Sequence, residues 1–204
     1  MFSVAEINRL QQATVERWHN FEIDNPYEGF LATVCKQHSF NFLLWHEEDI
    51  ARSRDVSDQR IAQVKRAIDR YNQQRNDWIE RVDDQISAIL TANEIVPAPA
   101  AALNTETPGS AIDRLSIMSL RVYHLDEQLQ RTDVTVRHTE SVEKKLAVCL
   151  MQQADLSKSL QSLIDDIFAG RKIHRTYRQF KMYNDPALNP YLYQAMQKLS
   201  LIHI

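Results

Sequence analysis

Glycine is nearly absent from this 204-residue chain, and its absence restricts the fold more than any other feature. Gly29, Gly109 and Gly170 are the three glycines, whereas an average protein contains about 7% glycine. Sheet proteins use glycine in tight hairpin turns, and many nucleotide-binding folds use it in phosphate-binding loops. The sequence has neither an Asn-Gly or Asp-Gly turn nor a glycine-rich phosphate loop. The composition therefore argues against the common sheet-based nucleotide-binding folds.

Apolar residues recur at helical spacing through most of the chain, which predicts amphipathic helices. Ser3, followed by Glu6, has the pattern of a capping box, and Thr107 before Pro108 marks another clear helix start. Gly170 is placed to end a helix. The predicted long helices cover about 3–25, 29–54, 57–92, 107–129 and 133–169. We predict an all-α fold, an antiparallel bundle of four to five long helices with a short C-terminal helix.

We expect one helical domain over residues 1–204. Val96–Leu103 contains two prolines and no charged residue, and is predicted to be a crossover between helices. Arg171–Asp185 is rich in Lys and Arg and is predicted to form an ordered strap on the bundle. At least one of its aromatic residues should be partly buried: Tyr177, Phe180 or Tyr183. A short last helix should start at Asn189. Leu199–Ile204 (LSLIHI) reads like a translated sequencing adapter, so we expect it to be an artefact.

Charge and cysteine content indicate the compartment and exclude some partners. The 24 Lys and Arg against 27 Asp and Glu give a net charge of -3, so we do not expect nucleic acid as a partner. No apolar run approaches the ~20 residues of a membrane span, and the N-terminus does not resemble a signal peptide. Cys35 and Cys149 both fall on apolar helical faces. We expect a cytoplasmic protein, and the sequence leaves room for an oligomer.

Four segments resemble a bacterial family of unknown function, domain-of-unknown-function family four-two-five-four. They are Asn41–Arg52 (NFLLWHEEDIAR), Ile68–Asp83 (IDRYNQQRNDWIERVD), Leu103–His124 (LNTETPGSAIDRLSIMSLRVYH) and Arg178–Asp185 (RQFKMYND). With the helices between them, the resemblance covers nearly the whole chain. It implies an all-helical protein without an established activity.

His46 and Asp49 are three residues apart, so both project from one helical face. Histidines and carboxylates on facing helices are how helical bundles build metal sites. We predict that His46 and Asp49 meet Asp113 and hold a divalent metal such as Mg²⁺ or Mn²⁺. The candidate catalytic residues are His46, Asp49, Asp69 and Asp113. Alternatively, the acids form an ion-pair network with Arg75 and Arg114 as counter-ions, or a solvated surface.

Polar residues on two other helices suggest an anion site. The backbone N–H groups after Thr107 lie at a helix N-terminus, which favours an anion, and Arg114 and Arg121 follow on one side of this helix. The candidate ligand-binding residues are Asn72, Arg75, Asn76, Thr107, Gly109, Arg114, Arg121 and Lys181. Ordinary helix capping and solvation account for the same residue types, so this alternative stays open.

Three functions remain in competition. The first is a binding or accessory protein with a polar inner cleft for an anionic, sugar-phosphate-like or nucleotide-like ligand. The second is a metal-assisted phosphoester or pyrophosphate hydrolase, and the third is a structural scaffold. Helical pyrophosphohydrolases carry a Glu-Glu-x-x-Glu motif, but here Ala51 stands where the third acid after Glu47 and Glu48 should be. The sequence leaves open whether the protein is an enzyme.

Overall fold

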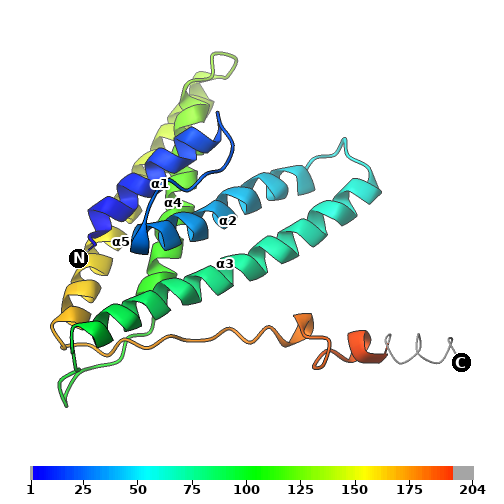
Figure 1. Cartoon of the computed structure of the whole chain (residues 1–204). Helices are drawn as coiled ribbons and strands as arrows, with labels where there is room; N and C mark the ends of the chain where they lie inside the picture. The colour runs from blue at the N-terminus through cyan, green and yellow to red at the C-terminus, as the bar shows by residue number, and fades with distance from the viewer. Residues whose placement is uncertain (1, 195–204) are drawn as a thin grey trace, which may run out of the picture.

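The computed structural model describes residues 2–194, in which five long helices form the fold (Figure 1). They are α1 (Val4–Trp18), α2 (Gly29–Ala51), α3 (Asp58–Ala92), α4 (Pro108–Leu129) and α5 (Val136–Phe168), followed by the 3₁₀ turn η1 (Met182–Asn184). Residues 190–194 are again helical. The described part contains no strand, and Ala102 and Lys172 form an isolated β-bridge. The predicted all-α fold is confirmed.

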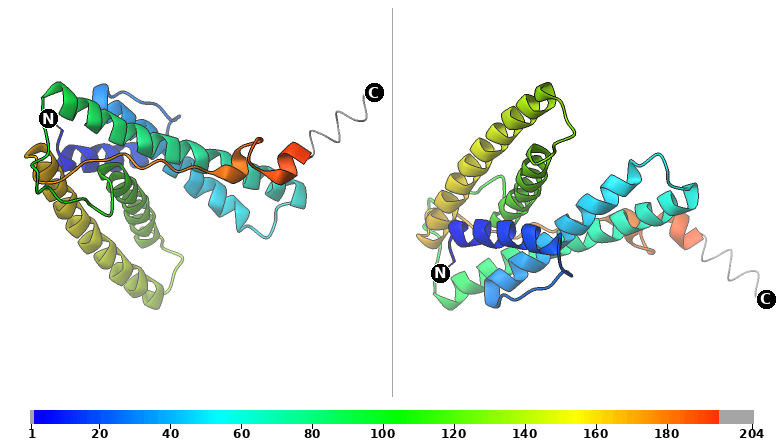
Figure 2. Two further views of the ribbon diagram at one scale, coloured as in Figure 1. Left: turned by 90° about the horizontal axis from the view of Figure 1, so that it is seen from below. Right: turned by 90° about the horizontal axis from the view of Figure 1, so that it is seen from above.

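The helices are arranged as two antiparallel hairpins that diverge from a shared base. Helices α2 and α3 form one hairpin, and α4 and α5 form the other, so that the molecule has the outline of a V in all three views (Figures 1 and 2). Helix α1 packs against α2, α4 and α5. No helix in residues 2–194 combines the length and the apolar character that crossing a membrane requires.

The main core lies where α1, α2, α4 and the end of α5 come together. Its fully buried side chains include Ile7, Leu10, Ile112, Leu115 and Leu160. Burying an aliphatic side chain of this size stabilises a fold by about 1.5–3 kcal/mol, so these contacts hold the base of the V. A smaller apolar cluster joins α2 to α3 farther out along their hairpin.

The helix starts follow local capping chemistry. The Ser3 hydroxyl accepts the Glu6 N–H at 3.3 Å, and the Glu6 carboxylate accepts the Ser3 N–H at 2.8 Å, which confirms the predicted capping box. Thr107 caps α4 as expected, and Ser57 caps α3, for which the sequence offered Asp55 or Ser57. Helix α5 begins after Thr135 rather than at Asp133, since the Thr135 hydroxyl makes the capping bond.

The end of α1 was wrongly predicted. The helix stops at Trp18 instead of continuing to residue 25, and Phe21 is 71% exposed instead of joining the apolar stripe. Asp24 folds back onto the end of α1, where it accepts the Trp18 indole N–H at 3.3 Å and pairs with Arg17. These contacts hold the intervening residues as a loop.

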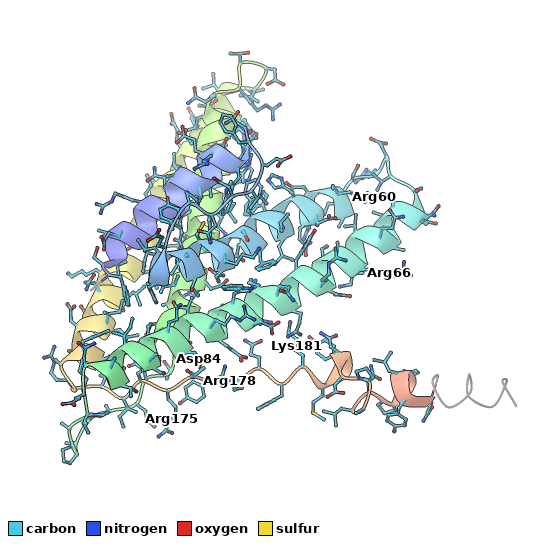
Figure 3. All side chains as sticks on the ribbon, viewed as in Figure 1. Arg60, Arg66, Asp84, Arg175, Arg178 and Lys181 are labelled. Carbon is cyan, nitrogen blue, oxygen red and sulfur yellow. The ribbon has the colours of Figure 1, made fainter. Side chains whose placement is uncertain are left out.

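Residues 171–185 run antiparallel to α3 along its outer face, as the predicted strap (Figure 3). Arg178 binds Asp84 at 2.8 Å and Glu80 at 3.1 Å. Of the three aromatic residues, only Tyr177 is about half-buried, with 52% exposed, whereas 85% of Phe180 and 64% of Tyr183 is exposed. Polar contacts therefore attach the strap. The suspected artefact, 199–204, lies outside the described residues.

Candidate metal centre

Three histidines from three helices meet on the side of the molecule where α1, α2 and α4 adjoin. His19 caps the end of α1, His46 lies in α2 and His124 lies in α4. One ring nitrogen of each lies within 4.8 Å of the other two. Within residues 2–194 this is the one group of three or more His, Cys, Asp or Glu side chains that converge in this way.

Two of the rings are oriented by acceptors on their own helices. His19 Nδ1 lies 2.7 Å from the Val15 carbonyl oxygen, and His124 Nδ1 lies 3.2 Å from Glu127 Oε2. Both partners only accept hydrogen bonds, so in the neutral form of each ring Nδ1 carries the hydrogen and Nε2 keeps its lone pair. Carbonyl and carboxylate partners of this kind orient metal-binding histidines in proteins.

The two Nε2 atoms of His19 and His124 are buried and have no hydrogen-bond partner within the described residues. A buried polar atom without a partner is costly, and native proteins rarely keep one without a reason. A metal ion bound by these lone pairs would remove the cost.

Aromatic side chains surround the cluster. Tyr123 stacks on His19 with 4.2 Å between ring centroids, and Trp45 stacks on His124 at 4.7 Å. The Phe42 ring meets His46 edge to face at 4.5 Å. These contacts restrict the rotation of the imidazoles and supply no competing ligand.

The environment keeps His46 neutral. Its pKa lies below the usual value, mainly because of burial and then because of the neighbouring His19 and His124, while Asp49 and Glu127 act in the opposite direction. Metal binding requires a neutral imidazole. His46 is therefore ready to bind a metal at neutral pH without first losing a proton.

The donor set determines which metals fit. Zn²⁺ binds histidine nitrogen at about 2.0–2.1 Å in a tetrahedral arrangement, which places ligand nitrogens roughly 3.4 Å apart. The three ring nitrogens lie within 4.8 Å of one another, so the rings would have to close by up to about 1.4 Å. Imidazole suits Zn²⁺, Co²⁺, Ni²⁺ or Cu²⁺, whereas Mg²⁺ and Mn²⁺ prefer oxygen. Three nitrogens therefore favour a Zn²⁺-type ion over the Mg²⁺ or Mn²⁺ predicted from the sequence.

A hollow of about 620 Å³ opens beside His124, between α2, α4 and α5. Asp49 and Trp45 line it from α2, Arg121 from α4, and Lys145 and Cys149 from α5. Its size suits a small organic molecule. The histidine cluster thus adjoins a space that a substrate could enter.

Asp113, which the sequence placed with His46 and Asp49, lies elsewhere. Its Oδ1 atom accepts hydrogen bonds from Gln37 at 2.6 Å and from Asn41 at 2.8 Å, and lies 3.7 Å from Arg75 Nε. Burial raises its pKa, against the lowering effect of Arg75, Asn41 and Gln37. Asp113 thus belongs to the ion-pair network that the sequence left as an alternative, and the histidine cluster replaces the predicted metal set.

This network continues to a fully buried histidine. His38 Nδ1 lies 2.6 Å from the Ser116 hydroxyl, which also accepts the Asn41 amide at 2.7 Å, and the Trp18 ring stacks on His38. Burial lowers the His38 pKa to about 3. A neutral, enclosed imidazole of this kind ties α1, α2 and α4 together and has no access to a substrate.

The candidate functional residues of α3 lie in two different environments. Asn72 and Arg75 line a hollow of about 200 Å³ together with Asn41 and Trp45, and Asn76 is buried. Lys181 of the strap lies close enough to Arg75 that burial and this positive charge lower the Lys181 pKa. Asp69, the candidate catalytic residue of α3, is exposed and paired with Lys65 at 2.9 Å.

The predicted anion site at the start of α4 is already filled by the protein. Gly109 N–H donates to Asp83 Oδ1 at 2.7 Å, and the Thr107 hydroxyl accepts the Ser110 N–H. Arg114 is paired with Glu106 at 2.8 Å. Of this predicted group, Arg121 alone lines the hollow beside His124.

His19 and His124 were missed by the sequence interpretation. A signal existed for one of them: His124 and Glu127 are spaced three apart, as are His46 and Asp49. This repeat of a His-x-x-acid pattern on a second helix pointed to a paired site. His19 and Glu22 have the same spacing, but this spacing did not single out His19, because its position near the other two rings depends on where α1 ends.

The family model described as a protein of unknown function, DUF4254, matches residues 31–176. His46 and His124 lie inside the matched region, and His19 precedes it. No curated protein and no solved structure matches the chain.

Proposed function

Since the chain belongs to the DUF4254 family, whose description gives no activity, we propose a function from the site itself: a metal-dependent hydrolase. One observation carries the proposal. His19, His46 and His124 converge, and the Nε2 atoms of His19 and His124 are buried without a partner. Ligand nitrogens held in this way are typical of a Zn²⁺-type centre with three histidines.

Three protein ligands leave a fourth coordination position for water. A bound Zn²⁺ ion lowers the pKa of such a water to about 7, so that a hydroxide nucleophile is available at neutral pH. In the hydrolysis we propose, the hydroxide oxygen bonds to the electrophilic atom of the substrate. The bond to the leaving group breaks, and the leaving group departs with the electron pair and takes up a proton.

Asp49 is the candidate general acid or base. It lines the same hollow as His124, and the described residues include no ion-pair partner for it. A carboxylate at this place can accept a proton from the metal-bound water or return one to the leaving group. This keeps His46 and Asp49 as functional residues, with His46 as a metal ligand and Asp49 as the proton carrier.

The metal centre can be tested by titrating the purified chain with Zn²⁺ in a calorimeter and with Co²⁺ in a spectrophotometer. We expect one ion per chain and the visible absorption of tetrahedral Co²⁺. His19→Ala, His46→Ala and His124→Ala should each weaken binding more than about 100-fold, because even outer partners of metal ligands contribute 10–100-fold. His138→Ala on α5 is the control, since His138 lies outside the cluster.

The catalytic part is tested with p-nitrophenyl phosphate and p-nitrophenyl acetate on the Zn²⁺-loaded protein. Turnover should disappear in His46→Ala and fall by about 100-fold or more in Asp49→Asn, which should still bind the metal. A wild-type chain that binds no Zn²⁺ or Co²⁺ would refute the proposal. Tight binding without turnover of either ester would give the metal a structural role.

The second candidate, a binding protein for an anionic ligand, has a separate observation in its favour. Asn72 and Arg75 face a hollow of about 200 Å³, and Lys181 adds a second positive charge nearby. However, Asp113 already compensates part of the Arg75 charge. The Nε2 atoms of His19 and His124 have no partner among the described residues, and we therefore prefer the hydrolase.

A further inference from the structure

Two cations face the hollow beside His124 without an acidic partner. Arg121 lines it from α4 and Lys145 from α5, and within residues 2–194 neither forms an ion pair. The neighbouring arginines of the α4–α5 hairpin behave differently, because Arg114 pairs with Glu106 and Arg131 pairs with Asp133. Arg137, Lys144 and Lys158 of α5 also form no ion pair among the described residues, so Arg121 and Lys145 are distinguished by lining the hollow.

The hydrogen-bonding capacity of Arg121 is largely unused. Its Nη1 atom lies 3.6 Å from the Met118 sulfur, and a thioether is only a weak acceptor. Two carboxylates also face the hollow, but Glu127 is already bound to His124. The hollow therefore offers free donors on α4 and α5 and one free carboxylate, Asp49, on α2.

We propose that this hollow binds the phosphate group of a phosphorylated substrate, with Arg121 and Lys145 as its anion-binding residues. The inference rests on the proposed hydrolase, since the metal at the three histidines would be the third positive centre. A phosphate monoester is a dianion with three free oxygens, which matches three positive centres better than a carboxylate with two oxygens. A guanidinium also fits phosphate with two parallel hydrogen bonds.

The rest of the hollow suits the uncharged part of such a substrate. Trp45, Leu125 and Cys149 contribute apolar walls. Its volume of about 620 Å³ lies within the range of roughly 300–1,000 Å³ that is usual for small-molecule sites. We therefore expect a phosphorylated small molecule and not a macromolecular partner.

The reaction balances without a further reactant. The metal-bound hydroxide oxygen bonds to phosphorus, and the ester P–O bond breaks with its electron pair going to the leaving oxygen. That oxygen takes up a proton from Asp49, which had received it from the water. The products are inorganic phosphate and an alcohol. Arg121 and Lys145 would compensate the negative charge on the phosphoryl oxygens as the bond breaks.

The test is calorimetric titration of the Zn²⁺-loaded full chain with inorganic phosphate. Arg121→Ala and Lys145→Ala should each weaken phosphate binding about tenfold or more, as the loss of a charged hydrogen bond implies. Lys144→Ala is the matched control, since this neighbouring lysine does not line the hollow. Arg121→Lys keeps the charge but loses the two-pronged geometry, and it should lie between wild type and Arg121→Ala.

Two further titrations separate this inference from the hydrolase proposal. Both alanine variants should keep the wild-type Zn²⁺ affinity, since neither residue is a ligand. Acetate should bind at least tenfold more weakly than phosphate. Phosphate binding that neither variant reduces would overturn the inference, and so would acetate binding as tight as phosphate. If wild type binds no Zn²⁺, the hydrolase proposal fails, and the same variants titrated without metal still decide whether Arg121 and Lys145 hold phosphate.

Discussion

Gly109 shows how one residue joins two helices. A Cβ atom at this position would lie 2.6 Å from the Ile79 carbonyl oxygen and 2.8 Å from Asp83 Oδ2. The missing side chain lets the Asp83 carboxylate reach the Gly109 N–H at the start of α4, where the helix dipole favours negative charge. Burial raises the Asp83 pKa, against the lowering effect of the Thr107 and Gly109 hydrogen bonds. The contact thus requires both glycine and aspartate.

We expect Gly109→Ala to destabilise the protein by about 1–3 kcal/mol, the usual cost of overpacking. The sign of this change is informative, because replacing glycine by alanine within a helix normally stabilises a protein by roughly 0.5–1 kcal/mol. Urea denaturation measures the change. In the comparison variant Gly29→Ala the new methyl meets no atom within 4 Å, although φ is +56°, so only backbone strain of about 1–2 kcal/mol applies. A more stable Gly109→Ala protein would disprove the close approach.

Site residues with a local signal were predictable, and those that depend on tertiary structure were not. Arg75 interrupts the apolar rhythm of α3, which suggested a counter-ion, and it does lie 3.7 Å from Asp113. His46 and Asp49 were found from their spacing. His19 was not, because its role depends on where α1 stops and how α1 crosses α2 and α4. Spacing along one helix does not contain that information.

The starts and the ends of the helices are determined by different kinds of contact. Helix starts depend on neighbouring residues, so Ser3 and Thr107 were recognised as caps. Helix ends depend more on contacts made elsewhere: Asp24 turns the chain after Trp18, which the periodicity alone could not indicate. The position of the strap depends on the acidic residues of α3 to which it binds, and not on its own aromatic residues.

The strap provides a prediction at this scale. Arg178 reaches Asp84 and Glu80 on α3, whereas Arg175 points away from the helix (Figure 3). We expect Arg178→Ala to loosen the strap, so that limited proteolysis cuts within 171–185 several times faster. The free energy of unfolding should hardly change, since exposed ion pairs contribute little to stability.

Arg175→Ala is the control for this experiment, because it removes the same charge from the same segment without breaking an ion pair among the described residues. Equal cleavage rates in the two variants would show that Arg178 does not hold the strap.

At the scale of the whole molecule, two hairpins meet at a base that contains both apolar and polar contacts. The sequence predicted antiparallel helices. It did not predict the angle between the hairpins (Figure 2). That angle depends on how α1 packs between them. A metal at His19, His46 and His124 would join α1 to both hairpins.

The buried network at this base makes the stability of the whole protein depend on pH. His38 has a pKa of about 3 in the folded chain, against 6.5 for an unburied histidine. As the pH falls below 6.5, His38 becomes protonated in the unfolded chain but stays neutral in the folded chain. The free energy of unfolding therefore falls by up to about 1.4 kcal/mol per pH unit until about pH 3. Asp113 and Asp83 act in the opposite direction, because their folded pKa values are raised.

A His38→Gln variant isolates this contribution, since it leaves both carboxyl groups in place. At pH 7 the variant should be about 1 kcal/mol less stable, because it changes the hydrogen bond to Ser116 and the stacking on Trp18. Between pH 6.5 and pH 4 its urea midpoint should fall less steeply than that of wild type, and the two curves should converge or cross. If both proteins lose stability with the same slope, protonation of His38 is not what limits the fold in acid.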